Sequence, residues 1–192
     1  MNYNETKDLT KQYLLARIPF IAINSIEKKR VERMFLELSK EMNIPIYFYS
    51  MSKGLFEITS GKVLNETKTT TGVLDYIGEQ LKIKDNHIFV LSDITDIESE
   101  SVISRFLNDI VTLAEEHNSS IVIVHSGDTI WSNLKRLGMS LELPLPTEEE
   151  LYEIIKKSIL PYKSQIQLEW NEENFKEAME KQMRAERERR EQ

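Results

Sequence analysis

The chain alternates between short apolar runs and longer segments whose apolar residues recur at helical spacing. The run 87–94 is apolar at almost every position and has polar neighbours on both sides. This pattern is typical of a strand buried on both faces. Such strands occur where helices cover both sides of a sheet. We therefore predict an α/β domain with this run as its central strand.

The same two patterns recur along the chain and predict the order of its elements. Strands are expected at residues 19–23, 46–51, 87–94, 121–125 and 141–145. Helices are expected at residues 7–17, 24–43, 71–81, 102–114, 130–138 and 147–160. Regular alternation of strands and helices predicts a doubly wound parallel sheet. The expected fold is a three-layer αβα sandwich around a parallel five-stranded sheet.

Local signals place several of the element ends. Asn24 with Glu27 forms a predicted capping box for the second helix, and residues 147–150 form another for the last one. Gly138 is expected to end the short fifth helix. Pro144 lacks an N–H group, so the strand that contains it is expected at an edge of the sheet.

Two segments depart from the regular alternation. Residues 52–71 are rich in Ser, Lys, Gly, Thr and Asn, and predict a long irregular and mobile connection, with room for a small edge hairpin. Near the C-terminus, Asn171 is a helix cap signal, and nothing apolar follows Ala185. We therefore divide the chain into an α/β domain, residues 1–165, and a charged C-terminal helix or connector, residues 166–192.

Composition narrows the classes of function. The chain has 192 residues, 40% hydrophobic and 30% charged, with a net charge of -7. This acidic balance disfavours nucleic acid and anionic membranes, which need positive potential. The chain has no cysteine, which suits a reducing cytoplasm. Residues 1–11 are polar and carry both charge signs, so we expect no signal peptide, and no apolar run reaches the roughly 18 residues that a membrane span requires.

Ligands of doubly wound sheets bind beyond the carboxyl ends of the strands. After the first strand, a phosphate loop would need several glycines and a lysine, so that backbone amides surround the phosphate. Residues 24–30 contain no glycine, the first glycine of the chain is Gly54, and Glu27 would repel phosphate. Neither a Walker A loop nor a dinucleotide fingerprint is present.

Other chemistries have weaker support. The three histidines show no metal-ligand spacing, and Ser126 lies outside any G-x-S-x-G elbow. Asp93, Asp96 and Asp128 are candidates for a Mg²⁺ site, but capping or solvated roles are the default for such aspartates. We therefore expect no metal site and no catalytic residue.

Several motifs together resemble one family. Asp93 closes an apolar strand, as a Walker B aspartate does, and residues 125–126 follow the next strand, at the place of a polar sensor. Residues 143–151 resemble the fifth strand and following helix of that fold. Further likeness lies in residues 14–21, 49–55 and 89–93. Over residues 10–160 the chain resembles AAA-type ATPases of cyanobacteria, algal plastids and other bacteria, in which a degenerate ATPase-like domain precedes the catalytic module.

The resemblance implies a P-loop NTPase-like core without a functional Walker A loop. Ile94 follows Asp93 where an active ATPase carries its catalytic glutamate, and no arginine finger can be assigned. The resemblance thus implies no cofactor in this chain, with ATP and Mg²⁺ bound only by a following or partner AAA module. The vestigial site positions would be Asn24, Ser25, Asp93 and Ser126.

Our leading hypothesis is a non-catalytic AAA-like domain that acts in the assembly or regulation of an AAA-type ATPase, through contacts with its subunits or with a client. The candidate contact surface is Ser50, Lys53 and Gly54, with the segment 55–71 that follows. The alternative is a sensor domain that binds a small molecule or nucleotide at the strand ends without hydrolysis. A nucleic-acid module would rest only on the basic residues 28–30, Lys53 and the tail arginines. Association with further copies of the chain is compatible with the leading hypothesis.

Overall fold

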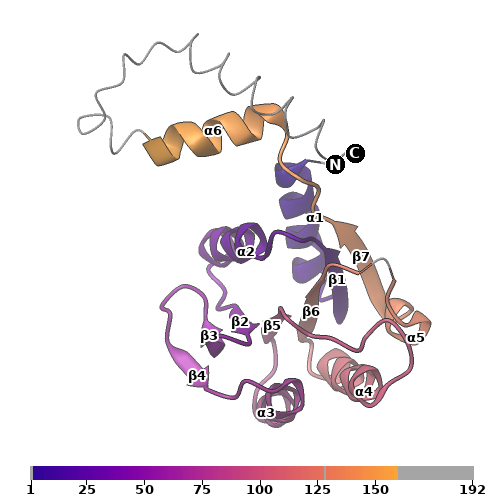
Figure 1. The fold of residues 1–192 in the computed structure, drawn as a ribbon. Helices are drawn as coiled ribbons and strands as arrows, with labels where there is room; N and C mark the ends of the chain where they lie inside the picture. Colours follow the sequence, from indigo (N-terminus) through magenta and orange to yellow (C-terminus); the bar gives the residue numbers. More distant parts are fainter. Residues whose placement is uncertain (1, 128, 160–192) are drawn as a thin grey trace, which may run out of the picture. The chain divides into compact units, whose positions relative to one another are not determined.

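The structure, a computed structural model, describes residues 2–127 and 129–159. The described residues form seven strands and six helices (Figure 1). In chain order these are α1 (Tyr3–Leu15), β1 (Phe20–Asn24), α2 (Lys28–Met42), β2 (Tyr47–Ser50), β3 (Gly54–Glu57), β4 (Val63–Asn65), α3 (Thr70–Ile83), β5 (Ile88–Leu91), α4 (Val102–Glu116), β6 (Ser120–His125), α5 (Ser132–Lys135), β7 (Gly138–Glu142) and α6 (Glu148–Ile159). The chain divides into two compact units, Met1–Leu145 and Pro146–Gln192. The strands and the helices α1 to α5 lie in the first unit.

The sheet has the strand order β4-β3-β2-β5-β6-β1-β7. The five strands from β2 to β7 in this order are joined by parallel pairings. Strand β3 runs antiparallel to β2, and β4 runs antiparallel to β3. The small edge hairpin allowed for within residues 52–71 is present as β3–β4, and it extends the sheet beyond the five strands that were expected.

Side chains alternate along the strands between two apolar cores, one on each face of the sheet. In β1, Phe20 and Ala22 join the core formed with α3 and α4, whereas Ile21 and Ile23 join the core formed with α2 and the end of α1. Figure 1 shows the helices on opposite sides of the sheet. Because both faces are covered, β1, β5 and β6 are buried almost throughout. The expected three-layer αβα arrangement is present.

Helix starts follow local capping chemistry. Asn2 and Glu5 form a capping box, with the Glu5 amide 2.9 Å from Asn2 Oδ1, and α1 therefore begins four residues before the expected start. Thr69, rather than the next two threonines, caps α3. The predicted capping box of α6 is confirmed, since the Thr147 and Glu150 amides each donate to the other side chain at 3.2 Å.

The predicted capping box of the second helix is wrong. Asn24 is the last residue of β1 and pairs in register with His125 of β6. Helix α2 begins only at Lys28, and its N-cap residue Glu27 makes no side-chain capping bond. The Glu27 amide instead donates to Ser25 Oγ at 3.2 Å. Pairing with β6 thus keeps Asn24 in the strand, although the local sequence predicted it to cap the helix.

The region around Gly138 also differs from expectation. Helix α5 ends at Lys135, and Gly138 begins the edge strand β7, which lies three residues earlier than expected and leaves Pro144 outside it. A Cβ on Gly138 would overlap the carbonyl oxygen of Phe20 and lie 2.6 Å from the Phe20 carbonyl carbon. Glycine is therefore required here by the close approach of β1, not by the end of a helix.

Some predictions fall on residues that the structure does not describe. These are the cap at Asn171, the charged helix or connector of residues 166–192, the domain boundary at residues 165–166 and Asp128, a candidate considered for Mg²⁺ binding. Of the described helices, none combines the length and hydropathy needed to cross a membrane.

Gly138→Ala should lower the free energy of unfolding by ~1–3 kcal/mol, because the added methyl group forces β7 away from β1. Gly127→Ala is the matched control, since a Cβ there meets no atom closer than 3.7 Å. Both variants remove the same freedom from the unfolded chain. Urea denaturation of the two variants measures the difference, and equal midpoints would contradict the close approach.

A second prediction concerns His87, which is only 8% exposed and packs against Tyr47 and Phe89 with ring centroids 5.5 and 5.3 Å away. Its Nε2 atom has no hydrogen-bond partner among the described residues. Burial lowers the pKa of His87 below its ordinary value. The unfolded chain therefore takes up this proton more readily than the folded chain, so stability is full above the unfolded pKa of about 6.5 and falls below it.

His87→Phe should reduce the loss of unfolding free energy between about pH 7.5 and about pH 5.5, because it removes one proton that only the unfolded state binds readily. Part of the pH dependence should remain, since burial also lowers the pKa of His125. Urea denaturation at the two pH values gives the slope. A slope identical to that of the unaltered chain would show that His87 is protonated equally in both states.

Candidate functional site

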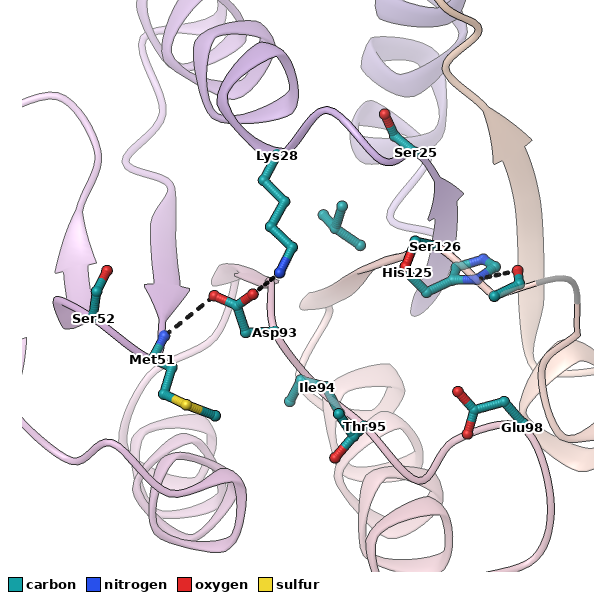
Figure 2. Close-up of a pocket in the computed structure, with 12 residues that line it drawn as sticks. Ser25, Lys28, Met51, Ser52, Asp93, Ile94, Thr95, Glu98, His125 and Ser126 are labelled. Carbon is teal, nitrogen blue, oxygen red and sulfur yellow. Dashed lines mark hydrogen bonds and ion pairs between the residues drawn. The ribbon is translucent and has the colours of Figure 1, made fainter. Parts of the chain in front are cut away.

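A pocket of about 610 Å³ opens at the carboxyl edge of the parallel strands (Figure 2). It is formed by the turn after β1 with the start of α2, the turn after β2, the loop after β5, and the end of β6 with the turn that follows. The polar side chains of its lining include Ser25, Lys28, Asp93, Thr95, Glu98 and Ser126. Parallel sheets bring these connections together, because all their strands end at one edge.

The turn between β1 and α2 comprises only residues 25–27. Two of its three amides already donate within the chain: Ser25 to the carbonyl oxygen of His125 at 2.8 Å, and Glu27 to Ser25 Oγ at 3.2 Å. Ser25 is buried, whereas Ile26 is exposed. A short turn whose amides point to protein acceptors offers few donors to a bound anion.

Asp93 lies between Lys28 and Met51 and is held from both sides (Figure 2). Its Oδ1 forms an ion pair with Lys28 Nζ at the start of α2, and its Oδ2 accepts from the Met51 amide at 3.4 Å. The Asp93 side chain is 24% exposed and that of Lys28 is 53% exposed, so solvent screens the pair. Asp93 also has φ +66°, a left-handed conformation that aspartate tolerates better than most residues.

His125, the last residue of β6, lines the pocket beside the turn that follows this strand. Its Nδ1 lies 3.0 Å from the carbonyl oxygen of Gly127, which accepts, so Nδ1 carries the proton. Burial lowers the pKa of His125, and the hydrogen bond to Gly127 and the nearby Glu98 carboxylate oppose part of this shift. Asn24 donates its side-chain amide to the same carbonyl at 3.4 Å. Together these contacts fix the turn that closes the pocket.

The structure brings together three of the four predicted vestigial positions. Ser25, Asp93 and Ser126 line the pocket, whereas Asn24 supports the turn and is not part of the lining. Asp96, proposed as a metal ligand, also lies outside the lining. In the described ranges no group of three or more His, Asp or Glu side chains could hold a metal ion.

The predicted contact residues lie at the turn between β2 and β3. Ser50 Oγ lies 3.3 Å from the Lys53 amide, and Lys53 Nζ pairs with Glu32 at 3.0 Å. Gly54 has φ +77°, and a Cβ there would overlap the carbonyl oxygen of Asn65. Gly54 is therefore explained by the hairpin itself, and the segment that follows contains β3 and β4.

Sequence reasoning did not select Lys28, Thr95 or Glu98 for this site. Lys28 was grouped with its basic neighbours as part of a weak nucleic-acid signal, and its role depends on where α2 begins. Thr95 and Glu98 belong to the loop between Leu91 and Val102, which has no periodicity. The only available signal was the position of this loop after the central strand.

Five parallel strands in the order β2-β5-β6-β1-β7, helices on both faces and an aspartate beyond β5 define an α/β domain of the AAA ATPase type. The chain belongs to the SpoVK-like AAA ATPase N-terminal domain family, whose model matches residues 6–143. No curated protein matches this sequence.

A solved structure has a similar fold. It is a chain in the structure of the HORMA:CdnC:Trip13 complex of E. coli MS115-1, with a TM-score of 0.62 and 11% sequence identity. The match covers 92% of this chain and 72% of that chain. At this identity the likeness shows the fold alone.

The backbone of Asp93 leads to a prediction about its replacement. Asp93→Ala should lower the free energy of unfolding by ~1–2 kcal/mol, because alanine lacks a side chain that stabilises the left-handed conformation. Asp93→Asn should cost less, since asparagine tolerates this conformation and can still accept from the Met51 amide. Thermal and urea denaturation of both variants tests this order. If the two variants lose the same stability, the left-handed conformation of Asp93 has no energetic weight.

Proposed function

We propose that this chain is a non-catalytic AAA-like domain that acts in the assembly or regulation of an AAA-type ATPase. It contacts ATPase subunits or a client and leaves ATP and Mg²⁺ to a following or partner AAA module. Any ATPase activity belongs to that module and not to this chain.

The turn after β1 is the observation that carries this proposal. A triphosphate needs a ring of free backbone amides, normally supplied by a glycine-rich loop. Here the turn has three residues and no glycine, and the Ser25 and Glu27 amides donate within the protein. These facts support a domain that does not hold nucleotide at this edge.

The loop after β5 gives a second line of support. Asp93, at the place of a Walker B aspartate, is already engaged by Lys28 and the Met51 amide. Ile94, where an active ATPase carries a carboxylate, is only 6% exposed. An apolar side chain cannot activate water, because general base catalysis requires a proton acceptor.

The family supports an AAA module as the partner, because its model describes the N-terminal domain of SpoVK-like AAA ATPases. The chain of similar fold was solved within a complex of several proteins, one of them Trip13, and this supports a domain of this fold acting within an assembly. On this chain, Ser50 and Lys53 at the turn after β2 remain our candidates for contact, together with the β3–β4 hairpin.

The pocket favours one alternative function. Its volume of about 610 Å³ lies within the ~300–1,000 Å³ typical of small-molecule sites. A sensor domain that binds a small molecule or nucleotide at the strand ends, without hydrolysis, would use this pocket.

Calorimetry separates the two functions. Titration of MgATP into the chain should give no binding heat up to about 1 mM, because the turn after β1 offers few free donors. A positive control is an active AAA module under the same buffer. Micromolar affinity for MgATP would count against the non-catalytic proposal and favour the sensor.

Association with an ATPase provides the positive test. The chain, mixed with a SpoVK-like AAA ATPase module, should co-elute with it in size-exclusion chromatography and change its rate of ATP hydrolysis. Lys53→Glu should weaken co-elution, because it reverses the charge at the proposed contact. Lys82→Glu, on the exposed side of α3, is the matched control. Absence of any complex at micromolar concentration would contradict a role in assembly.

A further inference from the structure

The pocket lining contains two carboxylates, Asp93 and Glu98, and only Asp93 has a cationic partner among the described residues. Glu98 lines the pocket, and within residues 2–127 and 129–159 its Oε2 accepts only the neighbouring Ile97 amide, at 3.0 Å. No Lys or Arg of the described residues forms an ion pair with it. Figure 2 shows Glu98 across the pocket from Asp93 and Lys28. The pocket therefore contains one carboxylate that no cation of the described chain neutralises.

The charges of the lining give the pocket a negative balance. Lys28 offsets Asp93, burial lowers the pKa of His125 and so disfavours its cationic form, and the charge of Glu98 remains. The chain as a whole also has a net charge of -7. Complementary charge attracts a ligand, whereas like charge in a confined site repels it. The pocket thus suits a cationic group and disfavours phosphate or carboxylate ligands.

The donor set distinguishes between kinds of cation. A metal ion needs several oxygen or nitrogen ligands around one point, and the part of the chain that is described has no such group of three side chains. A guanidinium or ammonium group needs only one carboxylate and a few further acceptors. The hydroxyls of Thr95 and Ser126, also in the lining, can accept such hydrogen bonds. An organic cation therefore fits better than a metal ion.

Exposed apolar side chains near the pocket favour a basic side chain of a protein over a free organic cation as the ligand. Ile26, in the turn beside Ser25, is 68% exposed, and Met51, part of the lining, is 49% exposed. A small polyamine would gain little from these apolar groups. A protein segment brings apolar neighbours together with its basic side chain, and it would bury them here.

We propose that this pocket receives one basic side chain, arginine or lysine, from an apolar segment of a partner protein, and that Glu98 is its ion-pair partner. The proposal rests on the proposed function in that the partner is the AAA ATPase module. The carboxyl edge of the parallel strands, which lacks a phosphate-binding loop, would then recognise a protein.

The test uses the full chain and a capped tripeptide, acetyl-Leu-Arg-Leu-amide, in an NMR titration. The peptide should bind with a dissociation constant of about 1 mM, since three residues cover little surface. The same peptide with citrulline in place of arginine keeps the shape and loses the charge, and it should bind about tenfold more weakly. Equal binding of both peptides would overturn the proposal without any change to the protein.

Variants then locate the contact. Glu98→Gln should weaken binding of the arginine peptide about tenfold, because it removes the negative charge. Glutamine can still accept the hydrogen bond from the Ile97 amide, so the loop should keep its conformation. Glu115→Gln, an exposed glutamate of α4 outside the pocket, is the matched control and should change nothing. If Glu98→Gln binds as well as the unaltered chain, the assigned ion pair is wrong.

A third variant tests the apolar contact. Ile26→Ser should weaken binding of the tripeptide several-fold and leave binding of acetyl-arginine-amide unchanged. Equal affinity of the two probes, or tight binding of spermidine alone, would indicate a site for a small cation and overturn docking of a protein segment.

The outcome is distinguishable from failure of the proposed function. If MgATP binds in calorimetry, the non-catalytic proposal fails whatever the peptide does. If neither MgATP nor the arginine peptide binds, only the assignment of the pocket to a basic side chain fails.

Discussion

Burial of both faces of the parallel strands is the constraint on which this structure depends. A strand such as β5, apolar on both faces, cannot meet water, so helices must cover each side of the sheet. The loops that connect strands and helices therefore lie at the two ends of the strands, where their backbone and polar side chains form hydrogen bonds. Asp93 and Ser126 follow neighbouring strands in the sheet, and this constraint brings them to one pocket although they are far apart in the sequence.

Several polar groups at the carboxyl ends of the parallel strands already have hydrogen-bond or ion-pair partners within the protein. The Ser25 amide bonds to β6, and Asp93 bonds to Lys28 and to the turn after β2. Each of these contacts joins two segments of the chain that lie at this edge. Exposed ion pairs contribute little to stability, typically below about 1 kcal/mol, so their effect lies in which charges remain for a partner. Among the described residues of the lining, Glu98 is the carboxylate that remains.

The types of most elements were predictable because hydrophobic period reflects burial directly. Their ends were less predictable. The sequence around Asn24 contains a good capping box, but pairing with β6 keeps Asn24 in the strand. Gly138 has the form of a helix terminator, yet the carbonyl group of Phe20 approaches it too closely for any other residue. In both cases a contact with a distant strand outweighed a preference worth about 1 kcal/mol.

The α/β class of the domain and its parallel pairing, the lack of a glycine-rich turn after the first strand, and the place of Asp93 beyond the central strand were predictable from the chain alone. These follow from local pattern and residue type. The three-dimensional fold was needed to show that Lys28 pairs with Asp93, that His125 bonds to the turn after β6, and that Glu98 lines the pocket with no Lys or Arg partner in the described part of the chain. The physical reason is that charge balance depends on distance in space, which periodicity along the chain does not encode.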